Sequence, residues 1–424
     1  MLNRRNLCAG LGLSLGAAGL ARPALAQSAT LPFYASLGPE LIRYDLDVAR
    51  ATLARRNQVG LPANLQYAWP HPSRRYLYAV ASNGQPPSGP TGVAGGDKNH
   101  YAIAFAVGAD GALTEHGARK LLPVRPIHCC TDLSGEHLLV AFNIPSMIHV
   151  YRLNADGSIG DEIIQDPSLD FGIYAHQVRA APSGRTVTLC SRGNDPTPTK
   201  PEDPGHVEVF GFADGKLTAL QKLAPRGDGY GFGPRHLDFS PDGRFAYVSL
   251  ERENALCVYG MDSAGRFSDE PVFLKSALSD PLGKMKHPGQ GVGPIHVHPN
   301  GKFVYQTNRG SGTVEKDGRR VSNGGQNSVA VWAINRDNGE PTLIQNAPAH
   351  GFELRTFVID PSGKLLVAAS TTPLDVEENG QVHTVSAGLS LYRVAPDGRL
   401  SFVRKHDVDT SGGIQFWCGL LSMG

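Results

Sequence analysis

Residues 231–251 contain three side chains that could act together in acid–base or anion-binding chemistry. Arg235 and His236 open a short alternating strand pattern, and Glu251 ends the apolar strand pattern that follows. Pro241-Asp242-Gly243 lies between the two patterns and is typical of a tight turn, so the stretch predicts a β-hairpin. In a hairpin, the start of the first strand and the end of the second meet at one edge. We therefore expect a guanidinium, an imidazole and a carboxylate to form one polar site.

This hairpin is one copy of an internal repeat. Turns of the same kind, each followed by an apolar strand pattern, begin at His71, Asp132, Ala181, Ser240, His298 and Asp360. Successive turns are 49 to 62 residues apart, and most units then offer a third strand and a second turn. Near-regular spacing with about four strands per unit predicts an all-β propeller.

The two ends of the chain predict a seventh, composite blade. Residues 31–47 look like the second and third strands of a unit that lacks its first, and residues 411–421 look like a first strand with nothing after it. Pairing them would leave no free edge. We therefore expect residues 27–424 to form a single seven-bladed β-propeller domain, closed by pairing of the N- and C-terminal strands in one blade.

Propeller geometry places the starts of first strands, the ends of second strands and the loops between strands two and three on one face. Four of these loops are long and rich in Gly and Pro, which is typical of a functional face; they are residues 82–99, 192–206, 309–327 and 371–388. The first strands place His128, His176, Gln177, Arg235, His236, His296 and Arg355 at this mouth, and the second strands place Asn83, Asn143, Arg192, Glu251, Asn308 and Arg309. Any one of them could simply fill the central tunnel and form hydrogen bonds there. Several charged residues are rarely buried together, however, unless they have partners or a function.

Several motifs at this mouth match those of a known family: Gly233-Pro234-Arg235-His236, Ser240-Pro241-Asp242-Gly243 with Glu251, Ala175-His176-Gln177, and Asn308-Arg309-Gly310. They resemble the β-propeller lactonase family, which includes the propeller type of 6-phosphogluconolactonase and the fungal 3-carboxy-cis,cis-muconate lactonising enzyme. The resemblance implies that the catalytic residues are His176, Arg235, Glu251 and Arg309. We expect the substrate to be contacted also by His128, His236, His296 and Arg355.

The sequence departs from the family pattern in its first and last repeats. Tyr34-Ala35-Ser36-Leu37-Gly38 replaces a Gly-Thr-Tyr-Thr run, and Glu353-Leu354-Arg355-Thr356 replaces a Pro-Arg opening. Thr371-Thr372-Pro373 likewise replaces the usual Asn-Gln end. These departures affect the expected substrate more than the expected chemistry.

Opening a lactone needs an activated water, a group that stabilises the oxyanion and an acid for the departing alkoxide. Either Glu251 or His176 could be the base, while Arg235 and Arg309 would bind the carbonyl oxygen or a substrate anion. An adjacent arginine is expected to lower the pKa of Glu251 and keep it ionised. The sequence predicts no covalent nucleophile, because no Ser or Cys motif with a base partner occurs at this face.

Two other functions fit the same residues. A muconate-type lactonising cycloisomerase is favoured if the arginines bind carboxylates, and a non-enzymatic propeller would bind a ligand or partner on its loop face. His128, His176, His236 and His296 lie on successive first strands and could ring the tunnel as copper or zinc ligands. Neighbouring blades splay these histidines apart, however, and we expect neither a metal nor another cofactor.

The first 26 residues predict an export signal that is removed from the mature protein. Arg4-Arg5 precedes a weakly hydrophobic run rich in Gly, Ala and Leu, and Ala24-Leu25-Ala26 provides a cleavage site. The pair of arginines resembles a twin-arginine signal, so we expect the twin-arginine machinery to deliver the protein to the periplasm. A phosphorylated gluconolactone is a cytosolic metabolite. The expected substrate is therefore glucono-δ-lactone or another unphosphorylated aldonolactone.

Composition excludes other classes of partner. Without the three arginines of the leader, the chain has 37 basic and 39 acidic residues, so no basic field would attract nucleic acid. No apolar run after the leader is long enough for a membrane span. Five cysteines remain after the leader, all in strand-like apolar runs. Their odd number and positions predict buried free thiols.

Overall fold

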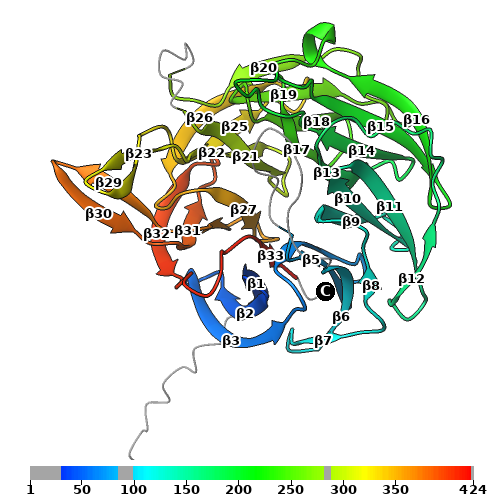
Figure 1. Ribbon diagram of the computed structural model, residues 1–424, viewed down its shortest axis with the longest axis horizontal. Coiled ribbons are helices and arrows are strands. Elements are labelled where there is room, and N and C mark those ends of the chain that lie inside the picture. Colours follow the sequence, from blue (N-terminus) through cyan, green and yellow to red (C-terminus); the bar gives the residue numbers. More distant parts are fainter. Residues whose placement is uncertain (1–29, 85–98, 281–287, 422–424) are drawn as a thin grey trace, which may run out of the picture.

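A computed structural model describes residues 30–84, 99–280 and 288–421. Within these ranges the regular structure is β-strand apart from one 3₁₀ turn, η1 (Pro225–Gly227), and none of it is a helix long and apolar enough to cross a membrane. The strands form eight sheets, of which seven surround a common centre and one extends to the side (Figure 1). The predicted all-β fold is confirmed. The predicted export signal lies outside the described residues.

Each of the first four blades is built from consecutive antiparallel strands. The first contains β4 (Leu65–Pro70), β5 (Tyr76–Ser82), β6 (His100–Val107), β7 (Leu113–Glu115) and β8 (Lys120–Leu121). The second contains β9 (Pro126–Thr131), β10 (His137–Asn143), β11 (Ser146–Leu153) and β12 (Ile159–Ile163). The third contains β13 (Ala175–Ala180), β14 (Thr186–Ser191), β15 (His206–Ala213) and β16 (Lys216–Leu223). The fourth contains β17 (Pro234–Phe239), β18 (Phe245–Leu250), β19 (Ala255–Gly260) and β20 (Phe273–Ser276).

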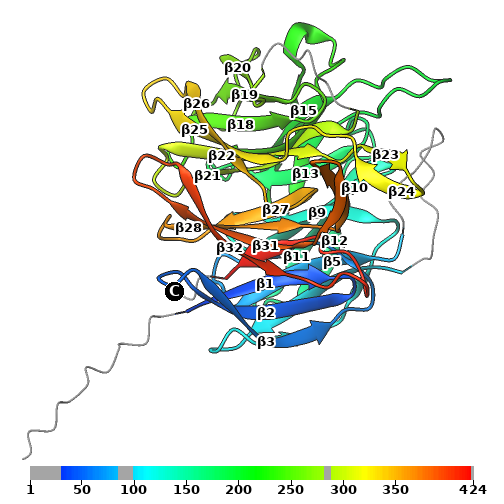
Figure 2. The same ribbon diagram turned by 90° about the vertical axis from the view of Figure 1, so that its left-hand side faces the viewer.

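The fifth and sixth blades each contain an insertion between their second and third strands. The fifth contains β21 (Gln290–Val297), β22 (Phe303–Gly310), β25 (Ser328–Ile334) and β26 (Pro341–Pro348). The sixth contains β27 (Leu354–Ile359), β28 (Leu365–Ser370), β31 (Gly388–Val394) and β32 (Leu400–Asp407). Figure 2, turned by 90°, shows the blades edge-on.

The seventh sheet combines the two ends of the described chain. It contains β33 (Cys418–Leu420), β1 (Leu31–Leu37), β2 (Glu40–Asp47) and β3 (Thr52–Gly60) in that order. The innermost strand, β33, is antiparallel to β1, with Tyr34 opposite Gly419. Its ladder is shorter than the predicted strand of residues 414–420. Residues 414–417 form separate hydrogen bonds with β1 and its turn, such as Ser36 N–H to the Trp417 carbonyl (2.8 Å).

Apolar packing joins every blade to its neighbours. The innermost strands touch in the order β4, β9, β13, β17, β21, β27 and β33. Seven buried apolar clusters lie between successive blades, and the one between the blades of β1 and β4 includes Tyr34, Leu65 and Trp417. Second strands such as β10 and β28 are buried along their whole length because both faces pack on other blades. The cysteines at positions 129, 130, 190, 257 and 418 are buried and unpaired, which confirms that prediction.

The repeated turn explains why the same strand ends gather on one face. In the fourth blade the N–H of Gly243 donates to the Ser240 carbonyl (2.9 Å), and Gly243 has a φ of 69°. A positive φ favours glycine, which has no Cβ to clash. The other copies place Gly135, Gly184, Gly301 and Gly363 in the same conformation. Each turn is tight and fixes where the first and second strands begin to pair. Near the opposite face all six of these pairs have an irregular register, and His176 and Arg235 lie at these irregular positions.

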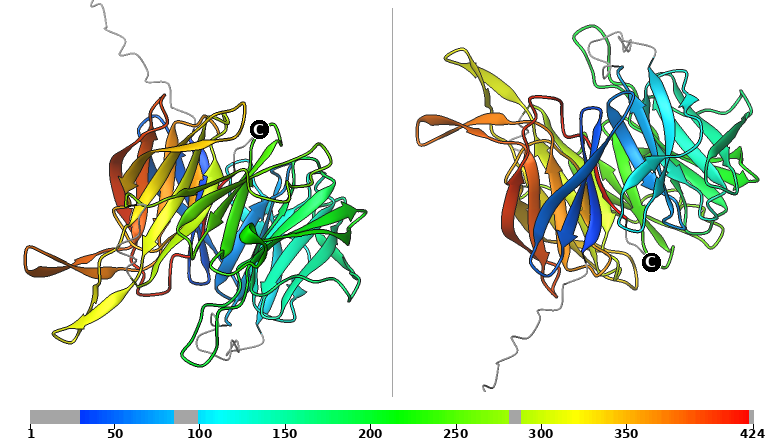
Figure 3. Two further views of the ribbon diagram at one scale, coloured as in Figure 1. Left: turned by 90° about the horizontal axis from the view of Figure 1, so that it is seen from above. Right: turned by 90° about the horizontal axis from the view of Figure 1, so that it is seen from below.

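Two segments predicted as long loops fold into strands instead. Residues 313–322 form the hairpin of β23 (Thr313–Lys316) and β24 (Arg319–Ser322), and residues 374–385 form the hairpin of β29 (Leu374–Glu378) and β30 (Gln381–Val385). β24 and β29 pair in parallel, which makes a four-stranded two-hairpin sheet that extends beyond the blades (Figures 1 and 3). The prediction as loops was wrong because the strands are short and each hairpin finds its pairing partner in another blade's insertion.

Candidate active site

Glu251 lies directly after β18, where the hairpin argument placed it. Its backbone N–H donates to the Gly233 carbonyl (2.7 Å), so the start of β17 lies beside it. Arg235 is the second residue of β17, and its Nε lies 3.4 Å from Glu251 Oε1. The structure therefore brings together the guanidinium and carboxylate predicted at this edge.

Two more arginines reach the same carboxylate from the flanking blades. Arg192 follows β14 and donates through Nε to Glu251 Oε2, while Arg309, near the end of β22, donates through Nη2 to Glu251 Oε1. Arg192, Arg235, Glu251 and Arg309 are called the carboxylate–arginine cluster below. Burial by itself raises the pKa of Glu251, but the charges of the three arginines, Arg192 first, outweigh burial and hold this pKa far below its ordinary value.

Two of these arginines, Arg192 and Arg309, each pair with a second carboxylate as well. Arg309 Nη1 lies 3.2 Å from Glu353 Oε2, and Arg309 Nη2 also donates to the Val292 carbonyl (3.1 Å). Arg192 donates through Nη2 to Asp195 in the loop that follows β14. Bidentate and networked pairs of this kind fix the guanidinium planes.

Arg235 and Arg355 are less completely paired. Arg235 Nη1 is buried and has no hydrogen-bond partner among the described residues. Arg355, the second residue of β27, lies over the Phe416 ring (4.7 Å) and has no carboxylate within 4.0 Å in the described part of the chain. Burial and then the charge of Arg309 lower the pKa of both side chains, yet arginine remains a cation at neutral pH. Two cations with spare hydrogen-bonding capacity therefore lie just below the mouth, where they suit a substrate anion or a polarised oxygen that enters it.

A column of neutral histidines continues inward from these arginines. His176 is the second residue of β13, and its ring centroid lies 5.0 Å from that of His236, which lies 6.2 Å from that of His128. Burial is the largest cause that lowers the pKa of all three well below 6.5. The charge of Arg235 further lowers the pKa of His176, whose Nδ1 is buried and has no partner among the described residues. A neutral imidazole beside the mouth can accept a proton.

The predicted position of His296 at the mouth is wrong. β21 begins at Gln290, so His296 is its seventh residue and lies opposite Tyr305, whereas Arg309 lies opposite Gly291. His296 Nδ1 lies 3.6 Å from Asp238 Oδ2, and His296 lines a pocket with Pro70 and Leu421, at the strand ends away from the mouth. The sequence pattern misplaced it because β21 starts earlier than the apolar run suggests, with an irregular register between Val292 and Ile295.

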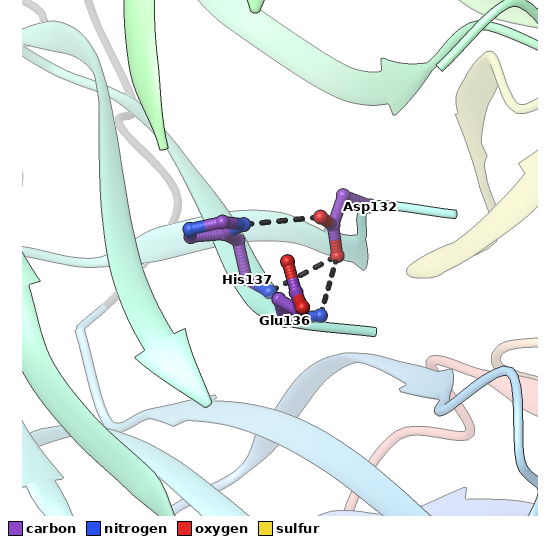
Figure 4. A group of neighbouring side chains, drawn as sticks. All are labelled: Asp132, Glu136 and His137. Atoms are coloured by element: carbon purple, nitrogen blue, oxygen red, sulfur yellow. Dashed lines mark hydrogen bonds and ion pairs between the residues drawn. The ribbon is translucent and has the colours of Figure 1, made fainter. Parts of the chain in front are cut away.

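The histidine column is not among the groups of described residues whose ligand atoms lie close enough together to hold an ion. Of the residues that the structure describes, the one group with three candidate ligand atoms close enough for an ion is Asp132, Glu136 and His137 (Figure 4). There the Asp132 carboxylate accepts the backbone N–H groups of Glu136 (2.9 Å) and His137 (3.0 Å), and lies 3.0 Å from His137 Nδ1. Asp360 caps the equivalent turn in the sixth blade in the same way. The group is thus a turn cap on the opposite face.

Sequence reasoning assigned no role to two residues of the site, Arg192 and Glu353. Strand alignment placed Arg192 at the mouth, eight residues after its turn glycine, which is also the position of Glu251 and Arg309 in their blades. That shared position could have assigned it to the site. Glu353 was noted only as a departure from the family pattern. Glu353 has a φ of 54° and contacts Arg309 of the neighbouring blade, and no sequence signal for that contact exists.

Comparisons with known proteins agree with this architecture. The family model described as "Lactonase, 7-bladed beta-propeller" matches residues 34–377, which confirms the predicted number of blades. A 6-phosphogluconolactonase of Pectobacterium carotovorum is 26% identical over 329 residues, 78% of this chain and 84% of the relative. The 6-phosphogluconolactonase of Bacillus subtilis is 25% identical over 339 residues, 77% of this chain and 83% of the relative. The structure of a periplasmic gluconolactonase from Pseudomonas aeruginosa has a TM-score of 0.68 and 20% identity, covering 92% of this chain and 99% of that one.

Proposed function

Since the chain belongs to the seven-bladed β-propeller lactonase family, we propose that it hydrolyses a sugar lactone such as glucono-δ-lactone. The observation that supports this most strongly is the convergence of Arg192, Arg235 and Arg309 on Glu251, beside the neutral imidazole of His176. This arrangement combines fixed cations with a proton acceptor in a partly dry site. Both are needed when water attacks a lactone carbonyl.

In the proposed mechanism His176, rather than Glu251, is the general base. The oxygens of Glu251 are occupied by guanidinium groups and the pKa of this carboxyl is strongly lowered, so it accepts a proton poorly. His176 takes a proton from water as the water oxygen attacks the carbonyl carbon. Arg235 stabilises the oxyanion through its unpaired Nη1. When the ring C–O bond breaks, His176 returns the proton to the alkoxide, which gives the open-chain acid.

Glu251 then acts by positioning the arginines. Its carboxylate offers acceptors to guanidinium groups from three blades, so it fixes their orientation and balances part of their charge. The Glu251 side chain is 16% exposed, which leaves the cluster open to substrate from the mouth. Arg355, His236 and His128 are proposed as substrate-contacting residues; His296 is not.

A lactonising cycloisomerase that acts on a carboxylated muconate is the second candidate. The incompletely paired Arg235 and Arg355 favour it, because two such cations match substrate carboxylates. The two reactions are separated by following glucono-δ-lactone, 6-phosphoglucono-δ-lactone and 3-carboxy-cis,cis-muconate against their spontaneous rates. Acceleration of glucono-δ-lactone opening that survives a chelator supports the proposed function. Turnover of the muconate alone supports the cycloisomerase, and acceleration of none supports a non-enzymatic binding propeller.

We also propose that the protein is exported to the periplasm by the twin-arginine machinery. The motivation is the Arg4-Arg5 pair and the cleavage site at Ala24-Leu25-Ala26, and the fold is shared with a periplasmic gluconolactonase of Pseudomonas aeruginosa. Replacing Arg4 and Arg5 with lysine is expected to retain the precursor in the cytoplasm, measured by cell fractionation and N-terminal sequencing. Normal export of that variant, with a mature terminus near Gln27, would indicate the general secretory route instead.

Finally, we propose that the pairing of β33 with β1 closes the propeller ring. The contact is supported by backbone bonds on both sides of the ladder, including Leu421 N–H to the Pro32 carbonyl (3.1 Å) and Gly38 N–H to the Ile414 carbonyl (3.0 Å). Closure of this kind removes free strand edges.

A further inference from the structure

We propose that the pocket between the two-hairpin sheet and the mouth binds a second sugar residue, so that the preferred substrate is an aldonolactone extended by a glycosyl group. The lactone half of this inference rests on the proposed function. The pocket has a volume of about 470 Å³, which is in the range of about 300–1,000 Å³ typical of small-molecule sites. Its lining comes from the segment after β22, the segment before β27 and the hairpin of β29 and β30.

The outer wall of this pocket is a formed element. β24 and β29 meet in a parallel pair at Val321 and Asp375, and Val321 is buried. Arg319 Nη2 also lies 2.7 Å from Asp375 Oδ2, which ties the two hairpins together beside the pocket. Sites built on paired strands hold their geometry better than sites on loops.

The pocket adjoins the proposed active site through one residue. Glu353 lines the pocket, and its Oε2 lies 3.2 Å from Nη1 of Arg309, which binds Glu251. The φ of Glu353 is 54°, a conformation that costs free energy for a residue with a side chain and is commonly kept at ligand sites. A ligand that places its lactone ring at Glu251 therefore reaches the pocket with its next residue.

The lining chemistry suits a neutral polyhydroxylated ring. Hydroxyl groups of Thr313 and Thr384 and carboxylates of Glu353 and Asp375 offer alternating donors and acceptors. Within the pocket Thr384 Oγ1 donates to Asp375 (2.6 Å) and Arg320 Nη2 donates to Thr313 Oγ1 (3.1 Å). Each of the two carboxylates is paired with an arginine, Glu353 with Arg309 and Asp375 with Arg319, and Arg320 also lines the pocket. The charges of the lining are therefore balanced, which suits a neutral ligand.

Phe352 supplies the one aromatic surface among the lining residues described. It is half-buried, so part of its ring faces the pocket. One face of a pyranose ring consists of C–H groups, and packing it on an aromatic ring removes apolar area from water. Hydroxyl and carboxylate partners around such a surface orient the sugar ring.

The test compares cellobiono-δ-lactone with glucono-δ-lactone in the wild-type protein and in Phe352→Ala. We expect kcat/KM to be at least about tenfold higher for cellobiono-δ-lactone, which corresponds to one additional favourable subsite. Phe352→Ala is expected to lower kcat/KM for the disaccharide lactone about tenfold more than for the monosaccharide lactone. Glu377→Gln is the matched control, because Glu377 is on the same hairpin and pairs with Lys316 outside the pocket; it is expected to keep the wild-type ratio.

A binding measurement tests whether the pocket binds a second sugar residue, independently of lactone hydrolysis. Calorimetry with the open-chain acids is expected to show cellobionate binding at least about tenfold more tightly than gluconate, with the difference reduced in Phe352→Ala. If neither lactone is hydrolysed but cellobionate keeps this advantage, the proposed function fails and the sugar site stands. If both lactones are hydrolysed with equal kcat/KM and both acids bind equally, the sugar site is overturned and the lactonase proposal stands.

Discussion

Glu251 carries a buried negative charge that the surrounding residues stabilise. Removing a carboxylate from water is costly, and the charge persists inside a protein only where partners compensate for the lost hydration. Guanidinium groups from the third, fourth and fifth blades supply that compensation. The same contacts that keep Glu251 ionised make it a weak base, which is why we propose the neutral His176 as the general base.

The pH dependence of hydrolysis tests the assignment of His176. The imidazole must be neutral to accept a proton, and its pKa is lowered well below 6.5 by burial and by Arg235. We therefore expect kcat/KM, corrected for spontaneous hydrolysis, to stay constant as the pH falls from 8 to 6.5. It should decline only at clearly lower pH. A decline centred at pH 6.5 or above would contradict this role.

The sequence predicts those contacts of the site that follow from the pairing of neighbouring strands, and no others. Arg235 and Glu251 were predicted to meet because a hairpin fixes the distance between them, and they do. His296 was misplaced because the start of β21 depends on packing that its residues do not reveal. The contact between Glu353 and Arg309 joins two blades and has no local signal.

At the scale of single elements, β15 contains a second buried carboxylate with the opposite behaviour. Glu208 lies in the middle of the third blade, and burial raises its pKa to about 8. In the unfolded chain the same carboxyl has an ordinary pKa near 4.5. The neutral form therefore favours folding below pH 4.5, and this contribution is lost as the pH rises through about 8.

Glu208→Gln is expected to remove that pH dependence. Gln matches the shape of the neutral carboxyl and cannot ionise, so the melting temperature of the variant should rise relative to wild type as the pH increases from 5 to 8. Thermal melts at pH 5, 6.5 and 8 measure the difference, with the exposed Glu378→Gln as a control. A difference that is the same at every pH would show that Glu208 is already ionised in the fold.

The elements also show what the sequence could not predict. The second strands were recognised because they are apolar on both faces, which the packing between blades requires. The two-hairpin sheet was not recognised, because β24 and β29 lie more than 50 residues apart in the chain and stabilise each other. The Gly and Pro content of residues 309–327 and 371–388 predicts loops, and only the long-range pairing of β24 with β29 makes strands of them.

At the scale of the whole molecule, the composite blade could be predicted because the two ends of the chain each contain only part of a blade. One end lacked an innermost strand and the other supplied one, and the structure pairs them. Trp417 and Leu421 then pack in the apolar cluster between the first blade and the composite blade. The C-terminal segment thus both pairs with β1 and packs against the first blade.

Deletion of residues 413–424 tests the proposal that this pairing closes the ring. Loss of β33 exposes the inner edge of β1 and part of the cluster around Tyr34. We expect the shortened protein to lose cooperative thermal unfolding or to be recovered only as aggregate. Deletion of residues 422–424 alone keeps β33 and is the control. A shortened protein that melts as the full chain does would show that the ring needs no such closure.

The most direct test of the central claim is the turnover of glucono-δ-lactone by the wild-type protein and by Glu251→Gln, with circular dichroism to verify the fold. The control is Glu340→Gln, since Glu340 pairs with Lys275 (3.0 Å) away from the mouth. If Glu251 holds the arginines that stabilise the transition state, the wild-type protein accelerates hydrolysis and Glu251→Gln lowers kcat by roughly 10²–10³-fold. Wild-type turnover in a folded Glu251→Gln variant would contradict the assignment of the active site.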